Sequence, residues 1–466
     1  MKKNVSLLLL LTLIFITSFA TIRLPAVISS NMVLQQQSSV TFWGWADPSE
    51  KIVITNSWSN SKDSVVATSN ANWKIKINTP AAGGPYTITI KGWNTIVLNN
   101  VLIGEVWICS GQSNMEMSNT SHIRDELPTS KNDNIRFFHI PRATSAYPQD
   151  NCEAKWEVCG PQSLTWFSAV GYFFGKKLQK DLNVPIGLIE SAWGGTPAES
   201  WTPSEVITSD PVMKEAAAKL PVTPWGPNLP GYIYNAMIAP VTNFQIAGTI
   251  WYQGEANVGI PFTYEKTMSS MITAWRKLWQ KDFPFYYVQI APFKYDKKFE
   301  GAALMEQQSK LQSVPNTGMI VITDLVDDIK DIHPKNKYDV GMRLANLALS
   351  QTYKQNILAK SPMFKTMEIN KNKVTIFFDN APNGFITKGN AKATEFYLAG
   401  EDKVFLPAVV KIEKDKIILT NKQITNPVAA RFSFSNTAMS NFFSKEGLPV
   451  NPFRTDNWEL DFVKEP

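Results

Sequence analysis

The chain has 466 residues, of which 44% are hydrophobic and 12% aromatic, and its formal net charge is +6. This composition is too apolar for an intrinsically disordered chain, and at about 100 to 200 residues per domain it can form two or three domains. The basic residues are scattered rather than gathered into runs or stripes, so the charge does not indicate a nucleic-acid partner.

Residues 1–20 have the three parts of a secretory signal peptide. Two lysines at positions 2 and 3 precede an apolar run over 7–16, and Ser-Phe-Ala (18–20) provides a small-x-small site before Thr21. The run is far shorter than the about 20 residues of a membrane-spanning helix. We therefore expect cleavage before Thr21, export to the periplasm or secretion, and no stable membrane anchor.

Both flanks of the chain have short, alternating, strand-like runs. At residues 21–100 the runs include 39–43 and 86–90, separated by Asp-Pro and Gly-Gly-Pro turns. At residues 361–466 they include 373–378 and 416–420, divided by Asn and Gly turns. This pattern predicts a small antiparallel β domain at 21–100 and a second β-rich region at 361–466.

Between these flanks, at residues 101–360, strand-like and helical segments alternate. The strand-like runs are 106–110, 186–190, 247–252, 285–290 and 319–323, and helical stretches lie at 169–182 and 338–350. A further helix is predicted by apolar residues at spacings of three and four: Met268, Met271, Ile272, Trp275, Leu278 and Trp279. The alternation predicts an α/β domain with a parallel sheet, and the apolar stripe predicts a helix face buried in its core.

Ligands of an open parallel sheet bind just past the carboxyl ends of its strands. The first of these strands is followed by Gly-Gln-Ser-Asn-Met (111–115), which places Ser113 on a tight turn before a helix. Such a turn presents the hydroxyl to solvent with helix N–H groups beside it. The motif alone is weak, because Met115 departs from the Gly-x-Ser-x-Gly pattern of α/β-hydrolases.

Two further strand ends carry potential hydrogen-bond donors. Ala-Trp-Gly-Gly-Thr (192–196) contains Gly194, whose backbone can approach a ligand closely, and Gln-Gly-Glu-Ala-Asn (253–257) ends in Asn257. An N–H group at either position can donate to a developing oxyanion. Taken singly, each segment is equally consistent with an ordinary turn.

A base for Ser113 has to come from three histidines: His122, His139 and His333. His333 alone follows a later strand of the predicted sheet, beside aspartates at 324, 327, 328 and 331 that can orient an imidazole. A solvated loop histidine is the alternative. The chain has no Cys-x-x-Cys or His-x-x-x-His spacing, so we do not expect a dedicated metal site.

The chain has three cysteines. Cys109 lies in an apolar strand and is expected to be a buried, unreactive thiol. Cys152 and Cys159 lie outside any obvious strand, and in an exported protein two such residues can pair. The sequence leaves open whether they do.

Taken together, the four segments resemble the sialate O-acetylesterase family of SGNH hydrolases. The resemblance rests on Gly-Gln-Ser-Asn-Met-Glu-Met (111–117), Ser-Ala-Trp-Gly-Gly-Thr (191–196), Trp-Tyr-Gln-Gly-Glu-Ala-Asn (251–257) and Asp-Ile-His-Pro (331–334), in this order. Segments at 24–27, 31–35, 447–449 and 452–458 are also similar to the family, so the resemblance spans nearly all of the mature chain.

The resemblance implies an SGNH-type three-layer α/β/α parallel-sheet domain between N-terminal and C-terminal β-rich regions. It implies a serine carboxylic ester hydrolase that removes O-acetyl groups from sugars, above all O-acetylated sialic acids, without a cofactor. Ser113 would be the nucleophile and His333 the general base. The N–H groups of Ser113, Gly194 and Asn257 would form the oxyanion hole.

The third member of the catalytic triad departs from the family pattern. Many SGNH enzymes have a carboxylate three residues before the histidine, where this chain has Lys330. Asp331 is the nearest carboxylate, and side chains two apart on an extended segment point the same way without necessarily touching. Asp328, a backbone carbonyl or no third group at all are the alternatives.

Two other functions are the alternatives. An acetylxylan or other polysaccharide acetylesterase would use the same catalytic groups with a different cleft. A non-catalytic carbohydrate-binding protein would have no need of Ser113, Asn257 and His333 together at strand ends. Trp193 and Trp201 are candidates for stacking on a sugar. The acetylated sugar, the hydroxyl position and the oligomeric state are not determined by the sequence.

Overall fold

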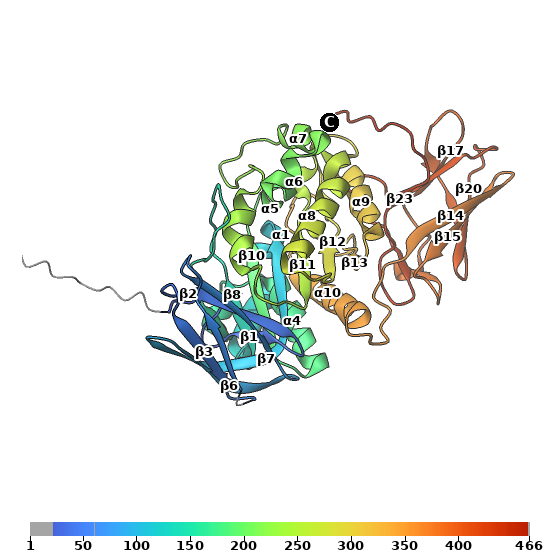
Figure 1. Cartoon of the computed structure of the whole chain (residues 1–466). Helices are drawn as coiled ribbons and strands as arrows, with labels where there is room; N and C mark the ends of the chain where they lie inside the picture. Colours follow the sequence, from blue (N-terminus) through green and yellow to red (C-terminus); the bar gives the residue numbers. More distant parts are fainter. Residues whose placement is uncertain (1–21, 60, 465–466) are drawn as a thin grey trace, which may run out of the picture.

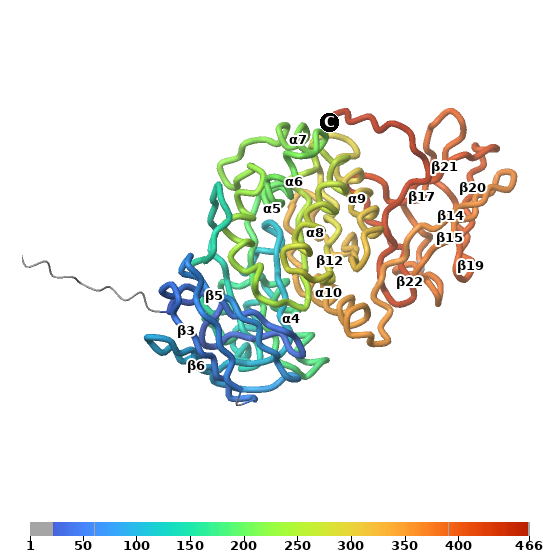
Figure 2. The backbone as a smooth tube through the Cα atoms, viewed as in Figure 1, coloured from blue at the N-terminus to red at the C-terminus, as the bar shows by residue number. Residues whose placement is uncertain are grey.

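The computed structural model describes residues 22–59 and 61–464. An N-terminal β region, a central α/β part and a C-terminal β region follow one another across the molecule (Figure 1). After the C-terminal region the chain runs back to the central part (Figure 2), where Lys464 forms a β-bridge with Lys297. The predicted signal peptide, residues 1–20, lies outside the described residues.

The central sheet has the strand order β13-β12-β11-β7-β10-β8-β9 and is parallel except for the β8–β9 pair. The strands are β7 (Thr95–Gly111), β8 (Asn132–His139), β9 (Trp156–Cys159), β10 (Ile186–Ala192), β11 (Gly248–Tyr252), β12 (Phe285–Val288) and β13 (Thr317–Ile320). It contains all five predicted strands. The sequence did not predict β8 and β9, which extend one edge.

Strand β7 belongs to two parts of the molecule. Its first half pairs antiparallel with β6 (Gly83–Lys91), and its second half pairs parallel with β10 and β11. The N-terminal sheet is therefore continuous with the central sheet. The other N-terminal strands are β1 (Val33–Gln35), β2 (Ser39–Trp45), β3 (Lys51–Asn56), β4 (Lys62–Val66) and β5 (Asn72–Asn78).

Helices cover both faces of the central sheet. Successive side chains of β7 point to opposite faces, so both faces have apolar side chains to bury. Val106 and Ile108 join the core that contains α8 (Tyr264–Trp279), and Trp107 and Cys109 join the core of α4 (Ala169–Leu182) and α10 (Lys337–Gln351). The remaining α-helices are α1 (Ser113–Glu116), α2 (Ser121–Glu126), α3 (Pro161–Leu164), α5 (Ala198–Trp201), α6 (Ser204–Thr208), α7 (Pro211–Ala217) and α9 (Glu300–Lys310).

The buried face of α8 is the predicted apolar stripe, with one exception. Met268, Met271, Ile272, Trp275 and Trp279 are at most 2% exposed, whereas 43% of Leu278 is exposed. The prediction for Leu278 is wrong. At 100° per residue its position falls at the edge of the stripe, where the helix surface begins to face solvent.

The C-terminal region is formed by antiparallel strands around a third core. Its sheets have the orders β14-β15-β20-β19, β18-β17-β21-β23 and β16-β22. The strands are β14 (Met363–Asn370), β15 (Lys373–Asp379), β16 (Phe385–Thr387), β17 (Phe396–Ala399), β18 (Leu406–Pro407), β19 (Val409–Glu413), β20 (Lys416–Thr420), β21 (Ala429–Phe432), β22 (Phe442–Ser444) and β23 (Phe453–Arg454). The predicted runs 373–378 and 416–420 lie in β15 and β20.

The three cysteines are free thiols. Cys159 lies at the end of β9, contrary to the expectation that it lies outside any strand, and its Sγ donates to the carbonyl oxygen of Ser130 at 3.1 Å. Burial raises the pKa of both the Cys152 and the Cys159 thiol to about 12. Cys109 is fully buried, as predicted. In the described part of the chain, no helix is both long and apolar enough to cross the membrane.

Candidate active site

The turn that carries Ser113 joins the end of β7 to the first residue of α1. Gly111 has φ +136°, and a Cβ atom there would lie 2.2 Å from the carbonyl oxygen of Tyr252 at the end of β11. The next residue, Gln112, donates its N–H to the same oxygen at 2.9 Å. This close approach requires glycine at position 111 and fixes the serine turn against the neighbouring strand.

His333 lies on the loop between β13 and α10, and its Nε2 is 2.9 Å from Oγ of Ser113. The structure therefore brings the predicted nucleophile and base together. The other two histidines have different partners: His122 stacks on Tyr338, and Nδ1 of His139 lies 3.1 Å from Glu190. Among the three histidines, only His333 contacts Ser113.

Asp331 is the carboxylate nearest to the His333 ring. Its Oδ1 lies 3.7 Å from Nδ1 of His333 and accepts the backbone N–H of His333 at 2.9 Å. Asp328 instead accepts the backbone N–H of Lys330 at 2.9 Å, which stabilises the turn. Burial lowers the pKa of His333, the charge of Lys337 lowers it further, and Asp331 raises it.

Gly194 lies directly beside Ser113. A Cβ atom built at Gly194 would be 3.1 Å from Cβ of Ser113, so a larger residue would press on the nucleophile. The N–H of Gly194 donates to Oε2 of Glu116 at 2.9 Å, and the same carboxylate binds Nε and Nη2 of Arg142 at 2.5 and 2.7 Å. The predicted Gly194 donor is thus close to the serine, and a paired carboxylate accepts its hydrogen bond.

Asn257 is positioned differently from the other predicted donors. Its side chain is 1% exposed, and its Nδ2 donates to Oε2 of Glu199 at 2.8 Å. Its Oδ1 accepts from the N–H of Ala198 and from Nε2 of Gln253. Both polar atoms of the Asn257 amide are thus bonded to residues other than Ser113, and they join the loop after β11 to helix α5.

Ser113 and His333 open into a cavity of about 510 Å³. It is also lined by Gly194, Glu116 and Arg142, and by Trp225, whose side chain is 64% exposed. Sequence reasoning missed Trp225, although an aromatic residue between Pro224 and Gly226 indicates an exposed loop.

Trp193 and Trp201, which the sequence suggests as residues that stack on a sugar, differ in burial and in their hydrogen-bond partners. Trp201 is fully buried, with Nε1 donating to Oγ1 of Thr196 at 2.9 Å, so it cannot contact a substrate. Trp193 is half-buried, and its Nε1 donates to the carbonyl oxygen of Trp225 at 2.9 Å. Trp193 therefore supports the loop that carries Trp225.

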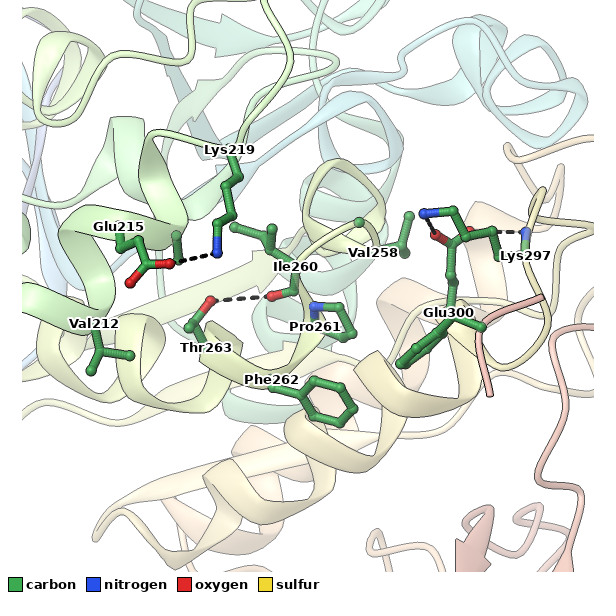
Figure 3. A pocket seen from close by; sticks show the side chains of 13 residues that line it. Val212, Glu215, Lys219, Val258, Ile260, Pro261, Phe262, Thr263, Lys297 and Glu300 are labelled. Atoms are coloured by element: carbon green, nitrogen blue, oxygen red, sulfur yellow. Dashed lines mark hydrogen bonds and ion pairs between the residues drawn. The ribbon is translucent and has the colours of Figure 1, made fainter. Parts of the chain in front are cut away.

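A second cavity, of about 360 Å³, is formed between α7 and the loop before α8 (Figure 3). Its lining lysines are paired, Lys219 with Glu215 at 2.7 Å and Lys297 with Glu300 at 3.5 Å. None of the predicted site residues lines it. Within residues 22–59 and 61–464, no three His, Cys, Asp or Glu side chains are grouped to hold a metal ion.

A comparison with known protein families identifies the family of this chain. Residues 103–350 match the sequence model of the family described as "Carbohydrate esterase, sialic acid-specific acetylesterase". The chain belongs to this family. It is therefore a carbohydrate esterase, a carboxylic ester hydrolase that removes O-acetyl groups from sugars.

Individual relatives of this carbohydrate esterase cover most of the chain. It is 28% identical to the sialate O-acetylesterase of Homo sapiens over 389 residues, 74% of each protein, and 29% identical to that of Rattus norvegicus over 442 residues, 79% of this chain and 81% of the other. The crystal structure of a carbohydrate acetylesterase from Xanthomonas citri superposes with a TM-score of 0.87 at 33% identity, covering 94% of this chain and all of that one. The α/β sheet with additional β-rich regions is thus a carbohydrate acetylesterase fold.

Proposed function

We propose that the esterase is an SGNH-type serine hydrolase in which Ser113 is the nucleophile and His333 the general base. The observation that carries this proposal is the 2.9 Å separation of Ser113 Oγ and His333 Nε2 at the wall of the cavity. A serine hydroxyl is a weak nucleophile until a base within hydrogen-bonding distance removes its proton. Because the pKa of His333 is lowered, its imidazole is neutral and able to accept that proton at neutral pH.

In the proposed reaction, Ser113 Oγ attacks the acetyl carbonyl carbon while His333 Nε2 takes the hydroxyl proton. The N–H groups of Ser113 and Gly194 donate to the oxyanion, and the acetyl oxygen replaces Glu116 Oε2 as the acceptor of the Gly194 N–H. His333 then gives the proton to the departing sugar oxygen. Water, deprotonated by His333, then attacks the acetyl-enzyme. The ester bond to Ser113 breaks, His333 returns the proton to Ser113 Oγ, and acetic acid leaves and ionises to acetate.

Asp331 and Asn257 receive different roles in this mechanism. Asp331 orients His333 and stabilises the imidazolium that forms. The resemblance implies Asn257 as a third oxyanion donor, but its hydrogen bonds to Glu199, Ala198 and Gln253 support an indirect role. We infer that Asn257 positions the segment after Gly194, which contains α5.

The proposed substrate is an O-acetylated sugar, with O-acetylated sialic acids first because several relatives are sialate O-acetylesterases. Acetylated xylan is the second candidate, since the same catalytic groups would act on it. Acetate release from O-acetylated sialic acid and from acetylated xylan, measured at equal acetyl concentration, decides between them.

The test of the mechanism compares Ser113→Ala, His333→Ala and the double variant. Each single variant should abolish acetate release with an unchanged circular dichroism spectrum, and the double variant should be hardly worse, because the two residues act as a unit. An organophosphonate probe should label Ser113, and much more slowly without His333. Wild-type acetate release by folded Ser113→Ala protein would show that the nucleophile is elsewhere.

We further propose that the mature enzyme is exported and begins near Thr21. The proposal is supported by the small-x-small site at 18–20, directly after the apolar run. N-terminal sequencing of protein recovered outside the cytoplasm should give Thr21 as the first residue, and recovery of exported protein with an intact Met1 would contradict it.

A further inference from the structure

A fully buried lysine lies behind the catalytic residues. Lys337, the first residue of α10, has no exposed surface, and its Nζ donates to Oδ1 of Asn114 at 2.5 Å. The ammonium also lies 5.4 Å from the ring centre of Tyr252. Lysine is almost never fully buried unless it is paired, so a buried ammonium at this place needs an explanation.

Asn114, the residue after the nucleophile, links Lys337 to the histidine loop. Its Nδ2 donates to the carbonyl oxygen of Ile332 at 3.1 Å and to Oε1 of Glu255 at 2.7 Å. The chemistry fixes this orientation of the amide, because a carbonyl and a carboxylate only accept hydrogen bonds whereas an ammonium only donates them. One side chain therefore joins the turn of Ser113, the residue before His333, and Lys337.

Helix stability does not account for the lysine. A positive charge at the first residue of an α-helix opposes the helix dipole, which favours anions at that end. Burial also lowers the pKa of the Lys337 ammonium, to about 7, against the opposing influence of Glu255 and Asp331. Placing a lysine here is thus unfavourable for folding, which indicates a role in the reaction.

We propose that Lys337 is a positioning residue for the Ser113–His333 pair. Through Asn114 it holds the two catalytic turns at hydrogen-bonding distance, and in the acid range, where it is charged, its ammonium disfavours protonation of the His333 imidazole. The inference rests on the proposed serine mechanism.

The charges near His333 shift its pKa in opposite directions. The charged and titratable groups around the pair are Glu255, Tyr252 and Asp331, together with Lys337 and His333 themselves. Lys337 lowers the pKa of His333, and Asp331 raises it. Below pH 7 Lys337 is mostly protonated, so the repulsion acts throughout the range in which His333 gains its proton.

The experiment measures kcat/KM for an aryl acetate against pH in the wild type, Lys337→Met and Lys337→Gln. Both variants remove the charge at nearly constant length. We expect kcat at pH 8 to fall at least tenfold, and the acid limb to move to higher pH by about half a unit or more, because His333 loses the repulsion. A residue that only supports the fold would not move the acid limb.

Lys335→Met is the matched control, since Lys335 is an exposed lysine on the loop that carries His333. Its acid limb and kcat should equal those of the wild type, because solvent screens an exposed charge. An unmoved acid limb and a kcat within threefold of wild type in folded Lys337→Met protein would overturn the inference. If both lysine variants fail to fold, Asn114→Ala decides: we expect at least a tenfold loss of kcat, and a loss below threefold overturns the inference.

The outcomes also separate this inference from the proposed mechanism. Activity in Ser113→Ala protein would contradict the serine mechanism, and with it the role of Lys337. Inactive Ser113→Ala together with an unaffected Lys337→Met protein would contradict only the role of Lys337.

Discussion

Asp331 contacts His333 twice: its Oδ1 accepts the backbone N–H at 2.9 Å and lies 3.7 Å from Nδ1 of the ring. The backbone bond anchors the carboxylate, so the ring interacts with a charge whose position is fixed. At 3.7 Å the ring contact is longer than a normal hydrogen bond, which has its heavy atoms at about 2.7–3.2 Å, and it becomes an ion pair only when His333 is protonated. In the proposed mechanism, this position lets Asp331 stabilise the imidazolium that forms when His333 takes the serine proton.

We predict that Asp331→Asn lowers kcat by at least tenfold, and by up to about 10,000-fold if the contact shortens during the reaction. Asp328→Asn is the control, because Asp328 contacts the backbone of Lys330 and should change kcat less than threefold. Steady-state acetate release measures both. Equally mild losses in the two variants, below tenfold, would indicate that Ser113 and His333 act as a dyad.

The pH dependence of the enzyme follows from the charges around His333. The base has to be neutral, so kcat/KM should rise with pH through the pKa of His333, which burial and Lys337 place below the ordinary value of about 6.5. Asp331 opposes both influences, so Asp331→Asn should move the acid limb to still lower pH. A profile measured from pH 4 to 8 tests this, and a wild-type midpoint above 6.5 would contradict it.

The elements that carry the fold were predictable because their pattern is local. Each of the five predicted strands is a run of apolar residues, and the stripe on α8 follows the helical period. Strand β8 was missed because it begins Asn-Asp-Asn, residues typical of turns, and β9 has only four residues at the sheet edge. Their pairing depends on neighbours distant in sequence.

For the site, too, residues in local motifs were predictable and residues placed by the tertiary fold were not. Ser113 and Gly194 were predicted because each lies in a short motif directly after a strand, and His333 because the chain has few histidines. Lys337 was not predicted, since a lysine at a helix start is usually solvated and only the tertiary fold places it on Asn114. The hydrogen bond from the Asn257 amide to Glu199 was not predicted either, because local sequence does not specify it, and the place of Asn257 in the oxyanion hole stays a prediction.

Replacing Asn257 tests the indirect role. In Asn257→Ala, Glu199, the N–H of Ala198 and Nε2 of Gln253 each lose a buried partner, and each unsatisfied group costs about 1–3 kcal/mol. We therefore expect the free energy of unfolding to fall by about 2 kcal/mol or more, together with kcat. Urea unfolding and acetate release measure the two effects. A kcat loss of about 100- to 1000-fold at unchanged stability would instead assign Asn257 to the oxyanion hole.

Trp225 lines the cavity beside Ser113 and His333, and contacts on two sides fix its position. Its carbonyl oxygen accepts Nε1 of Trp193 at 2.9 Å, and its ring packs over Gly195, where a Cβ atom would lie 2.3 Å from Cδ1 of the indole. Gly195 also has φ +73°, which favours glycine. An exposed indole that lines the same cavity as Ser113 is suited to stack on the face of a sugar ring.

We predict that Trp225→Ala lowers kcat/KM for an acetylated oligosaccharide about two- to tenfold, which corresponds to the about 0.5–1.5 kcal/mol of an aromatic contact. The loss should appear mainly in KM, because stacking is present in the bound substrate and in the transition state alike. Ethyl acetate has no ring to stack, so its hydrolysis should change less than twofold. Trp166→Ala is the matched control, since Trp166 is 76% exposed and does not line the cavity. Equal losses on the oligosaccharide and on ethyl acetate would show that Trp225 supports the catalytic groups instead of the sugar.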